Sequence, residues 1–221
     1  MPLESLPFAK ITNLLSFIFL TMSFLLIVRR TLAAQVRIFA VQSAVLATLA
    51  AVVAFFSGRR ELLGVAVVFV IVKVIVIPSV LNRAVGKLGI QRAVAPYLNT
   101  SVTLGVCAIL VVLAFFVMAP VTATNRLPTA DGIPLAFAGV LIGFFTTVNR
   151  RRALTQILGF LMLENSIFLL ALLASYGVPL IVELGVFLDV LVAVLILEVF
   201  IYRIKENFES IDVKNLGTLR G

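Results

Sequence analysis

Residues 153–202 decide the fold class. They comprise ALTQILGFLMLENSIFLLALLA (Ala153–Ala174), a short break, and PLIVELGVFLDVLVAVLILEVFIY (Pro179–Tyr202). Each half is long enough to cross a bilayer, because the hydrocarbon core takes about 20 mostly apolar residues as a helix. Each half also carries a carboxylate near its middle, Glu164 in the first and Asp189 in the second. At about 1.5 Å per residue, these acids lie ~15 Å along their helices, near the midplane of the membrane.

The composition extends this conclusion to the whole chain. Of its 221 residues, 62% are hydrophobic and 13% are charged, and so few charges cannot cover the surface of a soluble domain. The apolar runs predict an all-α, polytopic membrane protein with about seven membrane-spanning helices. The predicted spans are about Lys10–Val28, Val36–Phe56, Leu62–Leu81, Asn99–Ala119, Ile133–Val148, Ala153–Ala174 and Pro179–Tyr202.

The net charge of +8 could suggest binding to nucleic acid, but the basic residues lie in loops between apolar runs. Membrane orientation explains them better, because cytoplasmic loops carry an excess of Lys and Arg. We therefore expect no nucleic-acid partner, an external N-terminus and a cytoplasmic C-terminus. The 13 residues predicted on the cytoplasmic side are Arg29, Arg30, Arg37, Arg83, Lys87, Arg92, Arg150, Arg151, Arg152, Arg203, Lys205, Lys214 and Arg220, and the four on the other side are Lys10, Arg59, Arg60 and Arg126.

The sequence also contains an internal repeat at an offset of 122 residues. RRTLAAQVRIFAVQSAVLATLA from Arg29 aligns with RRALTQILGFLMLENSIFLLALL from Arg151, which places Gln42 opposite Glu164. Both copies begin on the basic side, so the repeat is parallel rather than inverted. The expected segments are an N-terminal three-helix unit with a basic loop (1–98), a connecting helix and outer loop (99–132), a second three-helix unit (133–204) and a cytoplasmic tail (205–221).

Several chemistries are excluded by residue types that the chain lacks. It contains no histidine, which removes histidine-based triads, histidine proton relays and the usual haem and zinc ligands. One cysteine, Cys107, permits neither an internal disulfide nor an iron–sulfur cluster held by this chain alone. No glycine-rich phosphate loop is present. We therefore predict no catalytic, metal-binding or cofactor-binding residue in this chain.

Glu164 and Asp189 are the first candidates for function. Acids inside membrane helices are rare, and they mark ion pathways and proton relays more often than chance would allow. Burial disfavours the charged form of a carboxylate, so such a group can take up and release a proton near neutral pH. The alternative is that each acid holds helices together through a hydrogen bond or an ion pair. We favour a role in proton translocation for both.

Lys73 is the third candidate, 11 residues after Leu62 in an otherwise apolar run. A lysine at this depth either pairs with an acid or gives up its proton, and the headgroups are more than a helical turn away for a snorkelling side chain. Pro78 follows five residues later and leaves the carbonyl of Val74 without its helical donor. We expect a local kink beside Lys73, although many membrane helices carry a proline for packing alone.

Other polar residues could extend a path from these three groups. Gln42, Asn165 and Ser166 lie within predicted spans and could equally serve as interhelical hydrogen-bonding groups. Glu183 and Glu198 lie nearer the ends of the last predicted helix, where solvation at headgroup level explains them as well as a role in ion entry or exit does.

Two resemblances to known families support these assignments. LMLEN (161–165) followed by LIVELGVFLDVLVAV (180–194) resembles the three-helix K subunit of bacterial complex I, which has an acid in each of two adjacent helices. Glu164 and Asp189 match those positions, with aspartate replacing glutamate at the second and a shorter spacing between them. The resemblance covers residues 133–202.

A second resemblance covers nearly the whole chain. QSAVLA (42–47), FVIVKVIVIPSVL (69–81), LMLENSIFLLALL (161–173) and DVKNLGTLRG (212–221) are similar to hydrogenase-4 component E. This resemblance implies a multi-pass subunit of the bacterial or archaeal inner membrane, in a group 4 nickel–iron hydrogenase or formate hydrogenlyase-type complex. It also implies antiporter-like subunits and a peripheral hydrogenase module as partners, with the nickel–iron and iron–sulfur centres on other polypeptides.

The buried acids and Lys73, together with what the resemblance implies, predict a non-catalytic subunit of an oxidoreductase complex that moves H⁺ or Na⁺ and links antiporter-like subunits. Three alternatives stay open: a purely structural scaffold for the antiporter-like subunits, a membrane subunit of a related Mrp-type antiporter complex, and a transporter that acts alone.

Overall fold

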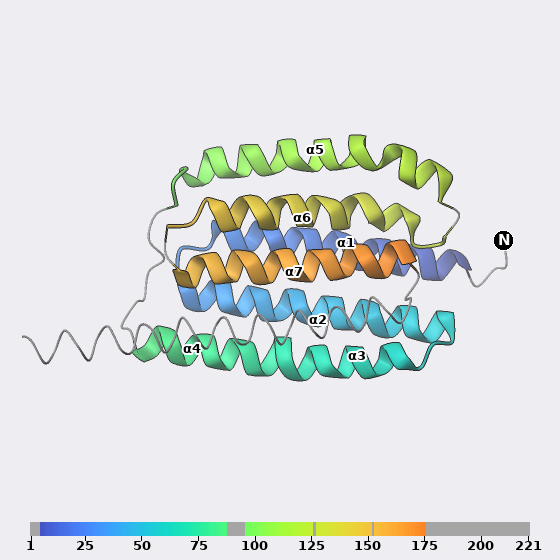
Figure 1. Cartoon of the computed structure of the whole chain (residues 1–221), viewed down its shortest axis with the longest axis horizontal. Coiled ribbons are helices and arrows are strands. Elements are labelled where there is room, and N and C mark those ends of the chain that lie inside the picture. The colour runs from blue at the N-terminus through green and yellow to red at the C-terminus, as the bar shows by residue number, and fades with distance from the viewer. Residues whose placement is uncertain (1–4, 88–95, 126, 152, 176–221) are drawn as a thin grey trace, which may run out of the picture.

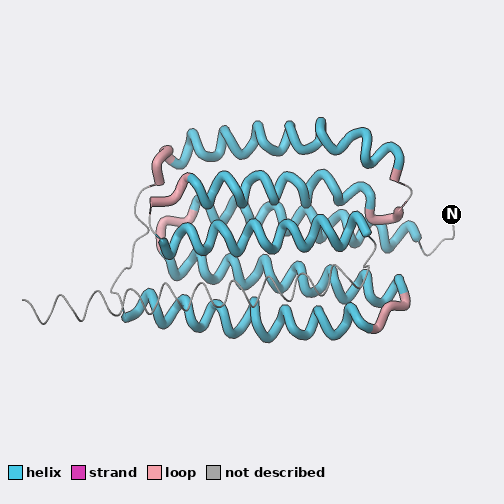
Figure 2. The backbone as a smooth tube through the Cα atoms, in the orientation of Figure 1, coloured by secondary structure: helices cyan, strands magenta, loops and turns pink. Residues whose placement is uncertain are grey.

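The computed structural model describes residues 5–87, 96–125, 127–151 and 153–175, and within these ranges every regular element is a helix. Six stretches of helix are long and apolar enough to cross a membrane (Figures 1 and 2). The seventh predicted span, 179–202, lies outside the described residues. The elements are α1 (Ser5–Val28), α2 (Leu32–Ser57), α3 (Glu61–Phe69), the π-helix η1 (Val70–Val76), α4 (Ile77–Lys87), α5 (Thr100–Thr124), the short 3-10 helix η2 (Ala130–Gly132), α6 (Ile133–Val148) and α7 (Ala153–Ser175).

One helix extends further than the sequence predicts. The fourth predicted span ends at Ala119, before Pro120, whereas α5 continues through this proline to Thr124. A proline removes one helical donor, but threonine side chains can bond to carbonyls of the preceding turn. Here Thr122 Oγ1 donates to the carbonyl of Ala119 at 3.0 Å, and Thr124 Oγ1 donates to that of Pro120 at 3.0 Å. These bonds lie within the last turn of the helix, whereas the carbonyl that loses its helical donor at Pro120 is that of Phe116.

Successive helices run in opposite directions, so the connections gather at two ends of the bundle (Figures 1 and 2). We call the end that holds the bends after α1 and α6 the basic end, because it carries Arg29, Arg30, Arg150 and Arg151. The opposite end holds the α2–α3 bend with Arg59 and Arg60. The arginines of the α1–α2 and α6–α7 bends thus lie at one end of the bundle, and those of the α2–α3 bend lie at the other.

The two copies of the predicted repeat lie in α2 and α7, and each of these helices forms a hairpin with the helix before it. α1 packs against α2, and α6 packs against α7; in addition α1 contacts α6, and α2 contacts α7. Both bends have the same hydrogen bond: Gln35 Nε2 donates to the carbonyl of Arg29 at 2.7 Å, and Gln156 Nε2 donates to that of Arg150 at 2.9 Å. At the bends, equivalent residues therefore lie 121 positions apart, one fewer than the offset seen in the sequence.

The remaining helices flank this pair of hairpins. α5 packs against α6 and α1, and the continuous helix formed by α3, η1 and α4 packs against α2 (Figure 1). In α5 only 17% of the most apolar stretch is buried in the bundle, against 61% in α7. Among the six spans, α5 thus has the smallest share of its apolar stretch buried in the bundle, and α7 has the largest.

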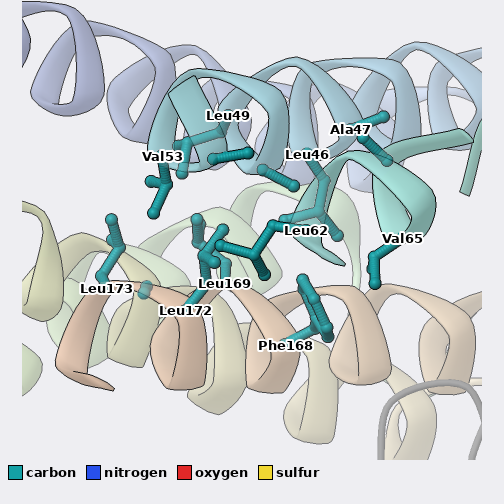
Figure 3. Close-up of a cluster of buried hydrophobic side chains, with 14 of the residues drawn as sticks. Leu46, Ala47, Leu49, Val53, Leu62, Val65, Phe168, Leu169, Leu172 and Leu173 are labelled. Carbon is teal, nitrogen blue, oxygen red and sulfur yellow. The ribbon is translucent and has the colours of Figure 1, made fainter. Parts of the chain in front are cut away.

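The buried apolar side chains form two clusters along the bundle axis. Cluster I includes Leu46 and Val53 of α2, Leu62 of α3, and Phe168 and Leu172 of α7, whose side chains meet between the three helices (Figure 3). Cluster II lies toward the basic end. It includes Val36 and Phe39 of α2, Ile77 and Leu81 of α4, and Leu158 and Met162 of α7. On each of these helices, the residues between the clusters include buried polar groups, which define the candidate site.

Candidate functional site

Lys73 and Glu164 form a buried ion pair between the two clusters. Lys73 Nζ lies 3.2 Å from Glu164 Oε1, and the two side chains are 1% and 3% exposed. Both residues lie near the middle of their spans, Glu61–Arg83 and Leu154–Ser175. Of the alternatives that the sequence left for Lys73, the structure places it beside an acid, and its burial rules out snorkelling to the headgroups.

Asn165 extends the pair toward α2. Lys73 Nζ donates to Asn165 Oδ1 at 3.0 Å, and Asn165 Nδ2 donates to Ser43 Oγ at 2.9 Å. The same ammonium lies 4.7 Å from the centre of the Phe69 ring, so the cation also contacts an aromatic face. Hydrogen bonds therefore connect η1, α7 and α2 through polar side chains that are almost completely shielded from the surroundings of the bundle.

The backbone around Lys73 is unusual, because Val70–Val76 is a π-helix. Its bonds close five residues apart: the N–H of Ile77 donates to the carbonyl of Val72. Pro78 follows directly and has no N–H to offer. The sequence predicts a local kink here, and the structure shows that the irregularity extends over seven residues N-terminal to the proline. Short π-helical segments are rare and occur frequently at functional sites.

Gln42 belongs to a second polar group, between α1 and α2. Its Nε2 donates to Ser23 Oγ at 2.8 Å, and Ser23 Oγ donates to the carbonyl of Phe19 at 3.3 Å. Gln42 Oε1 is buried and has no hydrogen-bond partner in the described part of the chain. Because Gln42 and Ser43 are consecutive, α2 presents one polar side chain to α1 and the next to α7.

Ser166 lies apart from the ion pair. Its Oγ donates to the carbonyl of Met162 in its own helix at 2.8 Å, and it packs where a Cβ on Gly139 would come within 2.8 Å of the oxygen. The serine therefore contributes to close contact between α6 and α7, and its hydrogen bond to Met162 does not lead toward Lys73. Asp189, Glu183 and Glu198 lie outside the described residues.

Ser43 and Ser23 are polar contacts that the sequence analysis missed. Both are completely buried, yet a single serine in a membrane helix is too common to stand out. A signal for Ser43 was present, since the predicted repeat places it opposite Asn165, its hydrogen-bond partner. Within the described ranges, no cluster of three or more His, Cys, Asp or Glu residues could hold a metal ion.

These features define a class: an all-helical, polytopic membrane protein with a hydrogen-bonded Lys–Glu pair in the middle of its spans. The chain belongs to the family of the uncharacterized protein Rv0085 of Mycobacterium tuberculosis, with 39% identity over 199 residues, or 90% of each chain. It is also homologous to hydrogenase-4 component E of Escherichia coli K12, with 28% identity over 187 residues that cover 83% of this chain and 85% of the relative. The match to Shigella flexneri component E is of the same extent.

This homology confirms the resemblance to hydrogenase-4 component E that the sequence indicates. No family model matches the chain. No solved structure matches it either.

Proposed function

We propose that this chain is a membrane subunit of a hydrogenase-4-type complex and that Lys73 and Glu164 take part in moving protons, or another small cation, across or along the membrane. Homology to hydrogenase-4 component E supports the first part. The 3.2 Å ion pair in the middle of two spans carries the second part. In this proposal the chain does no catalysis of its own, and it resides in the inner membrane of its host.

The pair offers a simple way to couple charge to proton affinity. A proton that reaches Glu164 removes the negative charge beside Lys73, whose ammonium keeps Asn165 Oδ1 as an acceptor. Conversely, a positive charge that approaches from a neighbouring subunit favours the ionised carboxylate. Two charges ~10 Å apart at an effective dielectric of ~20 interact by about 1.7 kcal/mol. Such coupling changes an equilibrium constant by more than tenfold, which is enough to reverse the direction of a proton transfer.

The partners in this proposal are antiporter-like membrane subunits and a peripheral hydrogenase module, with nickel–iron and iron–sulfur centres on those other chains. Asn165 and Ser43 would extend the polar contacts from Lys73 toward α2. Asp189, by its resemblance to the second acid of the complex I K subunit, would provide a further group on the same route.

The ion pair itself also supports a second candidate function, that of a structural anchor. A Lys–Glu pair that joins η1 to α7 holds two spans together in a medium that offers little other compensation for charge. In that case the chain would scaffold antiporter-like subunits of a hydrogenase or of a related Mrp-type complex, and no proton would need to leave Glu164.

Charge-neutral substitutions in the assembled complex separate the two functions. Glu164→Gln keeps the shape of the side chain and removes its ability to carry a proton, and Asp189→Asn does the same at the second acid. We expect both variants to assemble, to retain hydrogen-dependent electron transfer, and to lose most of the associated acidification measured with a pH-sensitive dye in membrane vesicles. Ser166→Ala, which alters a bond within one helix, is the matched control and should pump normally.

A native gel of the same membranes completes the test. Glu164→Gln leaves the Lys73 ammonium buried without its carboxylate, so it is compared with the double variant Lys73→Met/Glu164→Gln, which removes both charges. If both variants break up the complex, the anchor is the correct function. If Glu164→Gln assembles and pumps as the wild type does, Glu164 carries no protons and the translocation proposal is wrong.

A further inference from the structure

Arg150 is buried, and neither the fold nor the proposed function explains why. It lies in the bend between α6 and α7 at the basic end and is 5% exposed, whereas Arg29, Arg30 and Arg151 are exposed. The positive-inside rule accounts for exposed arginines, whose charge remains in contact with water and headgroups. It does not account for a buried one, because removing a charge from water is costly unless an opposite charge is nearby.

The contacts of Arg150 compensate little of this cost. Its Nη2 donates to the carbonyl of Ile27, near the C-terminal end of α1, at 3.5 Å. This contact with a helix C-terminus is favourable but long, and a guanidinium has five N–H donors. It is the only side-chain hydrogen bond of Arg150 that the described residues supply. Burial lowers the pKa of Arg150, yet an arginine keeps its proton in proteins.

The described carboxylates lie elsewhere in the molecule. They are Glu61 and Asp131, at the end opposite the basic end, and Glu164, paired with Lys73 between the clusters. The described part of the basic end thus combines several arginines with no acid. No carboxylate of the described residues therefore balances the buried charge of Arg150, and an anion held beside it would stabilise it.

The bend that carries Arg150 is held in place by its neighbours. The side chain of Asn149 accepts a hydrogen bond from the N–H of Leu98 at 3.0 Å and donates to Thr103 Oγ1 at 3.1 Å. Tyr97 lies against Arg151, with the guanidinium carbon 4.6 Å from the ring centre. The segment before α5 therefore fixes the bend from one side and orients one exposed arginine next to the buried one.

We propose that Arg150 anchors a phosphate-binding site at the basic end, and that its ligand is the headgroup of an anionic phospholipid. The planar fork of a guanidinium matches the oxygens of a phosphate, and exposed Arg29, Arg30 and Arg151 lie at the same end of the bundle. The bend lies where a membrane span ends, so a lipid phosphate is the anion present there at the highest local concentration.

The test uses the purified full-length chain in mild detergent with either phosphatidylglycerol or phosphatidylcholine. Native mass spectrometry counts the lipids that stay bound, and thermal unfolding measures the stabilisation that each lipid gives. We expect the wild type to retain phosphatidylglycerol in preference to phosphatidylcholine and to unfold at a higher temperature with it. Arg150→Gln should weaken this retention roughly tenfold, as loss of a charged hydrogen-bonding partner does.

Matched variants distinguish a specific phosphate site at Arg150 from non-specific attraction between anionic lipid and the surface arginines. Arg151→Gln removes an exposed arginine of the same bend, and Arg60→Gln removes one from the opposite end. Both should keep more of the preference than Arg150→Gln, and Arg150→Lys should restore part of it. Equal losses in Arg150→Gln and Arg151→Gln would show a diffuse surface charge and overturn the proposal.

Inorganic phosphate identifies the source of the ligand. If millimolar phosphate stabilises the wild type and not Arg150→Gln, the site takes phosphate from solution as well as from lipid. No preference for phosphatidylglycerol and no effect of phosphate in the wild type would refute the site. Arg150 would then be a brace for α1, and Arg150→Gln would lower the unfolding temperature equally in either lipid.

Discussion

The α1–α2 and α6–α7 hairpins have the same direction, the same bend hydrogen bond and adjacent positions in the bundle, but the middle of the second helix is neutral in the first hairpin and charged in the other, and we call them the neutral and the charged hairpin for this reason. In the middle of α2 lie Gln42 and Ser43, both neutral, whereas α7 carries Glu164 and Asn165. Like helices face each other, since α1 contacts α6 and α2 contacts α7. The neutral polar side chains of α2 thus pack beside the part of α7 that carries Glu164, and Ser43 accepts a hydrogen bond from Asn165.

The hairpins also differ in how closely their helices approach. The described part of α1–α2 contains no glycine, while α6–α7 contains three. A Cβ on Gly143 would come within 2.6 Å of Leu163 Cα, and one on Gly159 within 2.8 Å of the backbone nitrogen of Thr147. α6 therefore contacts α7 backbone to backbone beside Leu163, the residue that precedes Glu164. Close packing of this kind fixes α7 while leaving its polar face to Lys73 and α2.

The largest effect should come from removing the cation that balances the charged hairpin. Lys73→Met keeps the length of the side chain but leaves Glu164 buried without its ammonium partner. Breaking a buried pair from one side costs about 3–5 kcal/mol. We expect a markedly lower unfolding temperature in detergent and reduced yield of folded protein. The corresponding change in the neutral hairpin, Gln42→Leu, removes the hydrogen bond to Ser23 and the longer one to the carbonyl of Phe19, and should cost only about 1 kcal/mol.

A double variant tests whether charge is the cause. Lys73→Met with Glu164→Gln removes both charges, so it should recover much of the stability that Lys73→Met loses. If the double variant is as unstable as the sum of the single ones, the two side chains act independently, and the contrast between a charged and a neutral hairpin does not explain their stabilities.

The next effect concerns the close approach of α6 and α7. Gly143→Ala places a methyl group against the backbone of Leu163 and should force the helices apart, at a cost of about 1–3 kcal/mol. Gly105→Ala in α5 is the control, because nothing lies within 4 Å of a Cβ there and helix propensity favours alanine. Thermal unfolding of both variants gives the comparison. Similar stabilities would show that α6 and α7 can separate without loss, and that their glycines are not needed to position Glu164.

Much of the fold could be predicted from hydropathy. Long apolar runs leave little choice except membrane helices, and the six predicted spans that fall in described ranges all correspond to helices. The ends and irregularities of the helices could be predicted less well, because hydropathy does not report local hydrogen bonding. α5 continues past Pro120 to Thr124, and the π-helix before Pro78 depends on hydrogen bonds that no hydropathy pattern specifies.

The site could be predicted in part, for a physical reason. A charge in an apolar run stands out, so Lys73 and Glu164 were identified by type and depth alone. Their pairing could not be predicted, because it depends on which helices are neighbours and on the rotation of each. Ser43 and Ser23 were missed since serine is cheap to bury when it bonds to a carbonyl of its own helix or to a neighbour. The offset of the repeat could not be predicted at the bends either. Aligning the arginines gives an offset of 122 residues, whereas the equivalent hydrogen bonds of Gln35 and Gln156 give 121, and those bonds are visible only in the structure.

The smallest expected effect tests the feature that the hairpins share. Gln35→Ala and Gln156→Ala each remove one side-chain hydrogen bond to the first arginine of the bend, and a neutral hydrogen bond contributes about 0.5–1.5 kcal/mol. We expect both variants to lower stability slightly and by similar amounts, with additive effects in the double variant because the bonds lie in separate bends. Thermal unfolding with replicate preparations can resolve such a change. Gln42→Ala, which alters the middle of α2 instead of its bend, shows how much a glutamine contributes elsewhere in the same helix.

If Gln156→Ala were as harmful as Lys73→Met while Gln35→Ala had no effect, the bends would not be equivalent. The two hairpins would then resemble each other only in hydropathy. Gln42 and Glu164 could no longer be compared as equivalent positions in two similar hairpins.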